Sequence, residues 1–221
     1  MPDLPPFAEL AATPDAGLDV IALALAAEFR DVDAQEALAA LDVLGVDLAR
    51  EAAVTTGGPE PAALACARLL GGAHGFAGDR ENYDHPDNSM LDLVLTRRRG
   101  LPILLSVVYV EVARRAGIPL AGVGLPGHFV VGHFGAQPPV LLDPFVGGNT
   151  VQARGAEAQV RPWGAHEIAM RMLNNLVSAY QRRSDIGAAI RAAEMRVALP
   201  TDESHHAILE AELRAIRARL N

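Results

Sequence analysis

The sequence predicts an α+β protein in which a short antiparallel sheet lies between two helical regions. Three observations lead to this prediction. Helical patterns fill the first third of the chain, short alternating segments cluster within residues 120–151, and helical patterns return from residue 163 onward. Helices and strands that are grouped in this way, instead of alternating along the chain, are typical of α+β folds.

The composition is that of a folded protein with a sizeable core. The chain has 221 residues, of which 50% are hydrophobic and 21% are charged. A net charge of −8 and a single short basic cluster, Arg97-Arg98-Arg99, predict no nucleic-acid partner. The one cysteine, Cys66, excludes an internal disulfide. Because neither a membrane span nor a signal peptide is recognisable, we expect a cytoplasmic protein.

The N-terminal segment, residues 1–72, is predicted to be helical after a loosely packed lead-in at residues 1–16. Asp33 is the expected N-cap of its longest helix, with Glu36 as capping-box partner. Gly71 and Gly72 are expected to end its last helix. Helices are predicted at residues 18–29, 33–53 and 61–72.

The central segment, residues 73–160, contains the most informative helix. Pro102 suits a first helical turn and Gly117 suits the position after the last one. Almost no polar face interrupts this helix, which predicts that it is buried in the middle of the domain. A shorter helix at residues 89–99 is predicted from the S-x-x-D capping pattern at its start.

The segments at 120–125, 128–134 and 139–143 are predicted to be antiparallel strands. His128 and Asp143 lie at equal distances from the centre of the GAQP turn, so they are expected to face each other. A carboxylate that holds one imidazole nitrogen leaves the other nitrogen free as a base. His133 falls on the opposite face and is expected to be solvated.

The run NYDHPDNSMLDLVLTRRRGLPILLSVVYVEVARRAGIPLAGVGLPGHFVVGHF, followed by LLDPFVGG, resembles the SirB-like branch of the transglutaminase-like family. The resemblance covers residues 17–200, and PGHF and DPFxGG are its specific elements. It implies a papain-like transglutaminase core with a cysteine nucleophile at the start of a central helix. His128 and Asp143 match the histidine and aspartate of that core. The cysteine position falls on Pro102, which has neither a nucleophile nor an N–H group.

Two hypotheses about function follow. The first is a non-catalytic binding or regulatory protein that recognises a peptide or protein in the former active-site cleft. The second is a hydrolase or acyltransferase with a triad of Ser106, His128 and Asp143, since Ser106 lies one turn after Pro102. A serine inside a helix also commonly bonds the carbonyl four residues earlier, which would leave the first hypothesis.

The ligand-binding cleft is expected to lie beside this pair. Its predicted residues are Asn82, Tyr83, Asp84, Asn88, Pro102 and Tyr109. Tyr109 is more typical of a core residue, and the pattern of the loop residues favours bracing of their own loop and capping of the next helix. No metal or cofactor is predicted, because no ligand spacing such as HxxxH is present. Cys66, among small apolar residues, is interpreted as a packing cysteine.

The tail, residues 161–221, is predicted to be a helical hairpin with a further helix. Leu176, Tyr180, Ala189 and Pro200 fall near the pattern of a tetratricopeptide unit. One such unit cannot bury its own apolar face. The tail is therefore expected to pack on the core, or to offer a groove for a partner peptide. All three segments are expected to form one compact unit.

Overall fold

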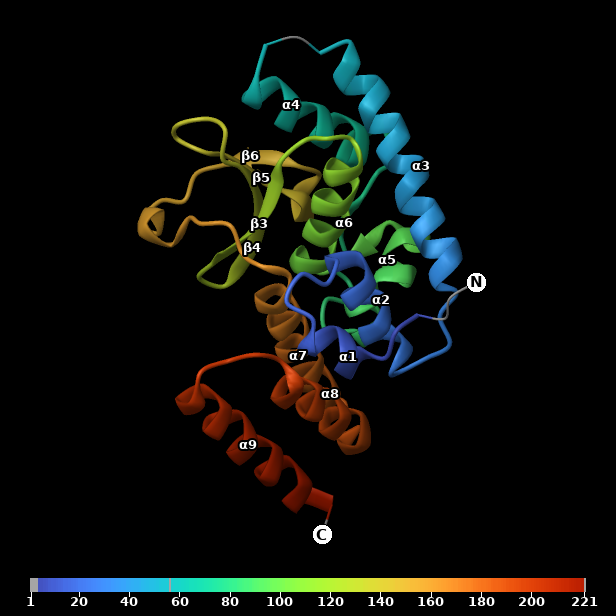
Figure 1. Cartoon of the computed structure of the whole chain (residues 1–221), viewed down its shortest axis with the longest axis vertical. Coiled ribbons are helices and arrows are strands. Elements are labelled where there is room, and N and C mark those ends of the chain that lie inside the picture. Colours follow the sequence, from blue (N-terminus) through green and yellow to red (C-terminus); the bar gives the residue numbers. More distant parts are fainter. Residues whose placement is uncertain (1–3, 56, 221) are drawn as a thin grey trace.

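The computed structural model describes residues 4–55 and 57–220. A four-stranded antiparallel sheet packs against the long helix α6, Pro102–Arg115, and helix α3 covers another side of α6 (Figure 1). The strand order is β3-β4-β5-β6, each strand pairing with its neighbour in sequence. The strands are β3 (Leu120–Leu125), β4 (His128–His133), β5 (Val140–Asp143) and β6 (Asn149–Val151). The α+β fold class predicted from the sequence is therefore confirmed.

Helices precede and follow the sheet. The helices before α6 are α1 (Phe7–Ala12), α2 (Leu18–Ala27), α3 (Ala34–Ala53), α4 (Pro59–Cys66) and α5 (Leu91–Arg97). A π-helical stretch, Ala67–Ala73, continues α4. The helices after the sheet are α7 (Ala165–Arg182), α8 (Ile186–Ala198) and α9 (Glu203–Arg217). A parallel pair too short to predict, β1 (Ala77–Gly78) and β2 (Arg99–Gly100), ties the loop before α5 to the loop after it.

Helix α6 is the buried centre that its sequence predicts. Leu104, Leu105, Val108 and Val112 are all 0% exposed. The helix starts at Pro102, and Gly117 follows its end with φ +73°, a conformation that glycine adopts without strain. The sheet packs on α6 through β3 and β4, the strand that begins at His128.

Two local predictions are wrong. The lead-in is not loosely packed, because Phe7 and Leu10 of α1 are buried, and α1 contacts α2 and α8. Ser89 does not cap α5. The N-cap residue is Met90, and no side chain makes a capping hydrogen bond there. Ser89 instead closes a 3₁₀ turn, Pro86–Ser89, whose Pro86 fixes a different backbone course before the helix. By contrast, the Asp33 carboxylate accepts a hydrogen bond from the Glu36 N–H at 2.9 Å, as expected of an N-cap.

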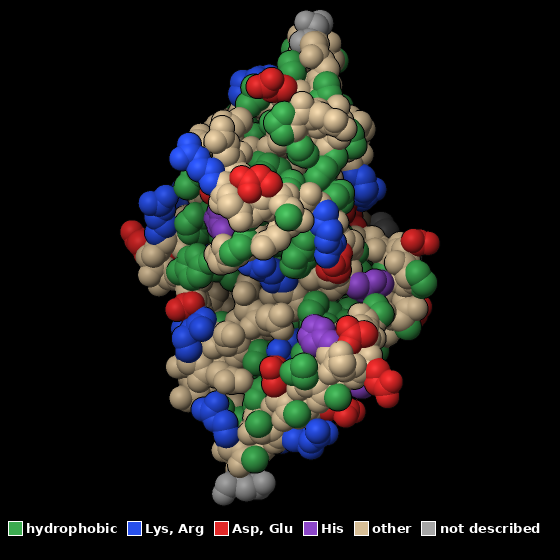
Figure 2. Space-filling view, turned by 90° about the vertical axis from the view of Figure 1, so that its left-hand side faces the viewer, with side chains coloured by type: hydrophobic (Ala, Val, Ile, Leu, Met, Phe, Trp, Pro, Cys, Tyr) green, Lys and Arg blue, Asp and Glu red, His purple; other side chains and the backbone are tan. Residues whose placement is uncertain are grey.

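The three segments share one hydrophobic core. Buried side chains of a single cluster come from α1, α3, α6, α7 and α9, for example Phe7, Leu41, Val108, Leu173 and Ile216. Helix α7 contacts α2 and α6, and α9 lies outermost, packed on α8 near the C-terminus (Figure 1). Among the described residues, no helix is both long and apolar enough to cross a membrane. Acidic and basic side chains are interspersed over the face seen in Figure 2.

Candidate functional site

The imidazole of His128, at the start of β4, meets the carboxylate of Asp143, at the end of β5. The distance from His128 Nε2 to Asp143 Oδ2 is 2.7 Å. The other carboxylate oxygen, Oδ1, accepts a hydrogen bond from the Phe145 N–H at 2.9 Å. The Asp143 side chain is 10% exposed and the His128 side chain is 33% exposed. The buried carboxylate thus orients a partly exposed imidazole, whose Nδ1 is the nitrogen left for other contacts.

The register of this hairpin differs from the predicted one. Val131 pairs with Leu142 and Gly132 pairs with Leu141. Continuing this register places Asp143 opposite Val130, two residues away from His128. A shift of two residues keeps a side chain on the same face of the sheet, so the diagonal pair still makes contact. The turn is longer than the predicted GAQP, because β4 ends at His133 and β5 begins at Val140.

His133 is buried, not solvated as predicted. It is 5% exposed, and its Nδ1 accepts a hydrogen bond from the Gly135 N–H at 3.1 Å. Burial lowers the pKa of His133. His133 shares its face of the sheet with Phe129 and Val131, which are buried in the main hydrophobic core, so this face packs inward instead of meeting solvent. His133, the last residue of β4, thus holds the start of the turn through its bond to Gly135.

The position expected for a nucleophile holds Pro102, which is buried. Ser106, one turn later, is 1% exposed, and its hydroxyl donates to the Pro102 carbonyl at 2.8 Å. Within the described part of the chain, no hydrogen bond joins Ser106 to His128. The serine thus makes the bond to the preceding turn that is common for serines inside helices.

Cys66 is not placed to attack either. It is 0% exposed at the end of α4, and its Sγ lies 3.4 Å from the Ala62 carbonyl oxygen. Burial raises the pKa of the Cys66 thiol to about 12, so the thiolate needed for nucleophilic attack is scarce at neutral pH. The packing role predicted from its small apolar neighbours agrees with this position.

Three of the predicted cleft residues lie in the interior. Tyr109 and Asn88 are both 0% exposed, and Pro102 is buried, so the prediction that they line an open cleft is wrong. Tyr109 projects from an inward face of α6. Its hydroxyl has no hydrogen-bond partner among the described residues, and burial raises its pKa. The hydroxyl is close to Gly148, where an added Cβ would lie 2.9 Å from it.

Asn88 braces the loop at residues 73–88, the alternative role that its sequence context allowed. Its amide nitrogen donates to the Asn82 carbonyl at 2.7 Å and to Asp79 Oδ2 at 3.2 Å. Its amide oxygen accepts from the Arg97 guanidinium at 3.0 Å. The loop is thereby tied to the end of α5. Exposed Asn82 takes part through its backbone, which leaves its side chain available at the surface.

Tyr83 and Asp84 line a cavity of about 250 Å³ at the start of α6. Leu101, the N-cap of α6, forms one wall, and α7 forms another through Asn175 and Ser178. Asp84 also pairs with Arg182 of α7 at 2.6 Å. The loop and α7 thus enclose the cavity next to Pro102, the position expected for a nucleophile. Neither His128 nor Asp143 lines this cavity.

Arg171 of α7 is a site residue that the sequence analysis missed. Its guanidinium donates to the His128 carbonyl at 3.0 Å and lies over the rings of Phe129, at 5.6 Å, and Trp163, at 5.9 Å. Burial lowers the pKa of Arg171. The signal in the sequence was a single arginine between two methionines, Met170 and Met172, on a helix that otherwise reads as amphipathic.

Aromatic and basic groups also surround the turn after Asp143. The ring of Tyr83 meets that of Phe145 edge-on, with 5.8 Å between centroids, and the Arg80 guanidinium lies 5.9 Å from the Phe145 centroid. Within residues 4–55 and 57–220, no three His, Cys, Asp or Glu side chains are grouped as a metal site would require. The groups around His128 can therefore supply hydrogen bonds, cation–π contacts and aromatic surface.

A buried helix packed on an antiparallel sheet, with a histidine and an aspartate paired on adjacent strands of that sheet, is the scaffold of transglutaminase-like proteins. The sequence profile of the Transglutaminase-like superfamily matches residues 35–181, and the chain belongs to this superfamily. The matched range contains α6, the sheet and α7 up to residue 181, so it includes His128, Asp143 and Arg171.

Curated relatives come from bacteria and from mammals. The chain is 37% identical over 138 residues to a UPF0162 protein of Xylella fastidiosa, covering 54% of this chain and 49% of the relative. It is 30% identical over 153 residues to a UPF0162 protein of Vibrio cholerae, covering 62% of this chain and 57% of the relative. It is 32% identical over 127 residues to F-box only protein 21 of Mus musculus, covering 48% and 20%. The chain thus spans about half the length of the bacterial relatives. No solved structure matches it significantly.

Proposed function

We propose that this protein is a non-catalytic, transglutaminase-like binding or regulatory module that recognises a peptide or protein beside the His128–Asp143 pair. The observation that carries the proposal is the state of the nucleophile position. Pro102 occupies it, and the Ser106 hydroxyl one turn later is buried and donates to the Pro102 carbonyl. The His128–Asp143 pair, which would activate a nucleophile, is thus kept although no nucleophile among the described residues is placed for it to activate.

The groups near His128 suit recognition of a polypeptide. The imidazole is partly exposed, Arg171 donates to the His128 carbonyl, and Tyr83 and Arg80 contact Phe145, two residues after Asp143. Protein-binding sites are enriched in aromatic and arginine side chains, because these combine apolar contact area with hydrogen bonding. The preorganised imidazole would contribute a directed hydrogen bond to such a ligand.

The competing proposal, a hydrolase or acyltransferase with a Ser106–His128–Asp143 triad, needs a hydrogen bond between serine and histidine. The direction of the Ser106 hydroxyl, toward Pro102, argues against it. To use this triad, the protein would have to break that bond and admit substrate to a side chain that is 1% exposed.

We also propose that the chain is a member of the SirB-like branch, with a cytoplasmic location and no nucleic-acid partner. The PGHF and DPFVGG motifs support the branch, and the net charge of −8 supports the lack of a nucleic-acid partner. The antiparallel α7–α8 hairpin, in which Leu176 and Ala189 are 0% exposed, supports a tetratricopeptide-like tail.

Affinity capture from a cell extract would test the binding proposal. We expect the wild type and a His206→Ala variant to retain the same partners, because His206 lies on α9 away from the site. We expect His128→Ala to lose those partners while remaining folded by circular dichroism. Equal capture by wild type and His128→Ala would contradict the proposal that this pair contributes to recognition.

A further inference from the structure

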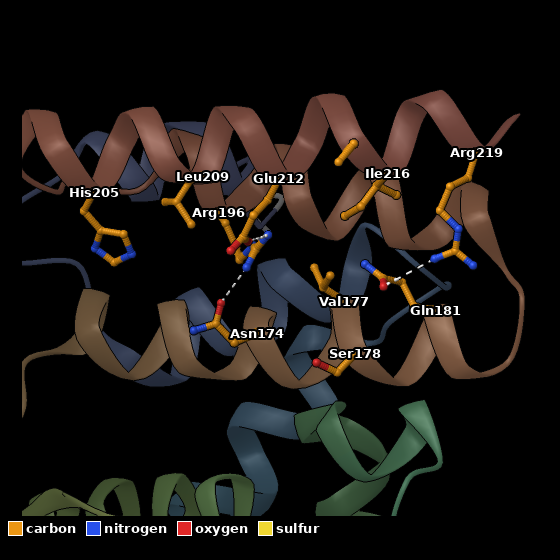
Figure 3. A pocket seen from close by; sticks show the side chains of 11 residues that line it. Asn174, Val177, Ser178, Gln181, Arg196, His205, Leu209, Glu212, Ile216 and Arg219 are labelled. Carbon is orange, nitrogen blue, oxygen red and sulfur yellow. Dashed lines mark hydrogen bonds and ion pairs between the residues drawn. The ribbon is translucent and has the colours of Figure 1, made fainter. Parts of the chain in front are cut away.

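A groove in the helical tail lies apart from the His128–Asp143 pair. It runs between α7 and α9, over α8, and has a volume of about 550 Å³ (Figure 3). The two helices run side by side in the same direction, so that His205 and Asn174 mark one end, and Arg219 and Gln181 mark the other. Its α9 side is lined by His205, Leu209, Glu212 and Ile216, which recur at the spacing of one helical face.

The floor of the groove is built around a buried arginine. Arg196 of α8 is 6% exposed, and its guanidinium donates to Asn174 Oδ1 at 2.9 Å and to Glu212 Oε2 at 2.8 Å. These two bonds reach one helix on each side (Figure 3). The Arg196 Nε is buried without a hydrogen-bond partner among the described residues. A buried N–H donor without a partner costs free energy, which a ligand acceptor at the floor would recover.

Three side-chain oxygens of the groove already accept hydrogen bonds, and several of its donors have capacity to spare. Asn174 Oδ1 and Glu212 Oε2 accept from Arg196, and Gln181 Oε1 accepts from Arg219 at 3.4 Å. The remaining groups include the two amide nitrogens, the Arg196 Nε and the rest of the exposed Arg219 guanidinium. Two arginines face one glutamate in this lining. A ligand that supplies acceptors and negative charge would complement these donors.

A second hollow, of about 620 Å³, continues the groove toward the sheet. It shares Asn174 and His205 with the first and reaches Trp163 and Arg171. Its acidic residue, Glu167, is already bonded to Arg161 and to the Gly164 N–H. The same excess of donors is thus present along the whole trough. A trough of this shape suits a polypeptide in extended form, whose backbone carbonyls recur along its length.

We infer that the α7–α9 groove binds an extended acidic peptide segment, whose carboxylates and carbonyls meet Arg196, Arg219 and the amides of Asn174 and Gln181. This site goes beyond the function proposed above, because none of its contacts requires His128. Charge-assisted hydrogen bonds from arginine to carboxylate are roughly twice as strong as neutral ones, so acidic side chains are the feature that sets the specificity. A basic segment would be excluded by the two arginines.

Fluorescence anisotropy with defined peptides tests the inference. The probes are fluorescein-labelled peptides of four Asp-Ser-Gly repeats, with Asn-Ser-Gly and Lys-Ser-Gly peptides as controls. The blocking variant is Ala215→Phe, since exposed Ala215 lines the groove, and its matched control is Ala207→Phe, an exposed alanine on another face of α9. Arg219→Glu and Arg214→Glu form a second matched pair, because Arg214 does not line the groove.

We expect the acidic peptide to bind wild type, Ala207→Phe, Arg214→Glu and His128→Ala alike. Ala215→Phe and Arg219→Glu should bind it at least about tenfold more weakly, as should wild type with the Asn peptide. Failure of the acidic peptide to bind below about 1 mM would overturn the inference. So would equal binding of the Lys peptide or an unchanged affinity in Ala215→Phe. Because the affinity for this peptide should not change in His128→Ala, its outcome is separate from that of the capture experiment.

Discussion

The two ends of helix α6 use their polar groups differently. At the C-terminal end, Glu111 and Arg115 form a buried ionic cluster with Asp19 of α2, and Arg115 also pairs with Asp42 of α3 at 2.6 Å. At the N-terminal end, Ser106 is bonded to its own helix, and the sheet that packs on α6 carries the His128–Asp143 pair, whose imidazole is one-third exposed. The charged groups of the first end bind one another, whereas the second end retains a group that can still bind something else.

This difference separates stability from function along one helix. The C-terminal cluster joins α2, α3 and α6 through side chains that are mostly buried, and Arg115 is 13% exposed in its side chain. Buried charges that bind one another are costly to separate, so this end should dominate the response to mutation. Substitutions at the N-terminal end should change the free energy of unfolding only slightly but should change the recognition of a partner. The predictions below run from the largest expected effect to the smallest.

Val108→Asp should unfold the protein. Val108 is 0% exposed in the middle of α6, between the two ends, so the substitution would bury a charge with no partner. We expect a loss of more than about 4 kcal/mol in the free energy of unfolding. Val46→Asp is the matched control, because Val46 of α3 is 51% exposed. Thermal melts that are the same for both variants would contradict the buried position of α6.

Arg115→Met should cost about 3–5 kcal/mol, because it removes the buried partner of Asp19 and Glu111 and leaves them only Arg114, whose side chain is 59% exposed. Arg50→Met is the control. The Arg50 side chain is 76% exposed and, among the described residues, pairs only with Asp47 three residues away, so its loss should cost about 0.5 kcal/mol or less. Urea denaturation measures both. If the two arginines cost the same, the C-terminal end of α6 is not a stabilising cluster.

Glu111→Gln and Asp19→Asn should shift the pH dependence of stability in opposite directions. Burial raises the pKa of Glu111 above its ordinary value of 4.5, so the protonated form stabilises the fold and this contribution is lost as pH rises. Burial also opposes ionisation of Asp19, but the Arg115 hydrogen bond and charge outweigh it and lower the pKa below 3.8. The contribution of Asp19 is therefore lost as pH falls.

The stability of Glu111→Gln relative to wild type should thus improve as pH rises above about 4.5. The relative stability of Asp19→Asn should improve as pH falls below about 3.8. Chemical denaturation at several pH values from 3 to 7 would show both trends. The same sign of pH dependence in both variants would contradict the opposite pKa shifts of these two carboxyl groups.

Ser106→Ala should cost only about 0.5–1.5 kcal/mol, the typical contribution of one hydrogen bond. The lost bond runs from the serine hydroxyl to the Pro102 carbonyl, which keeps its helical partner. Partner capture by Ser106→Ala should equal that of wild type. A variant that stays folded but loses its partners would show that Ser106 takes part in function. The N-terminal end of α6 would then differ from the C-terminal end in this residue also.

The sequence predicted the framework of this site better than its surroundings. Pro102 and Gly117 mark the limits of α6 through backbone conformation alone, and an apolar helix has to be buried. The contact between His128 and Asp143 survived a register error of two residues, because such a shift preserves the face. Local patterns can therefore place elements and faces.

The rest depends on contacts between segments that are distant in sequence. The positions of Tyr109 and Asn88 in the interior are set by the π-helical stretch, the 143–148 turn and α5, which no local pattern describes. Arg171 reaches His128 only because α7 returns to the edge of the sheet. The burial of α1 likewise depends on its contact with α8, which lies more than 170 residues later in the sequence. Sequence periodicity does not contain this information.

Activity-based labelling tests the central claim most directly, that the His128–Asp143 pair is kept without a nucleophile. The intact protein would be treated with a fluorophosphonate probe, which modifies activated serines, and separately with iodoacetamide, which modifies thiolates, and then examined by mass spectrometry. We predict no label on Ser106 and no rapid modification of Cys66, because both are buried and neither is bonded to His128. Labelling of Ser106 that disappears in His128→Ala would contradict the account and establish the serine triad instead.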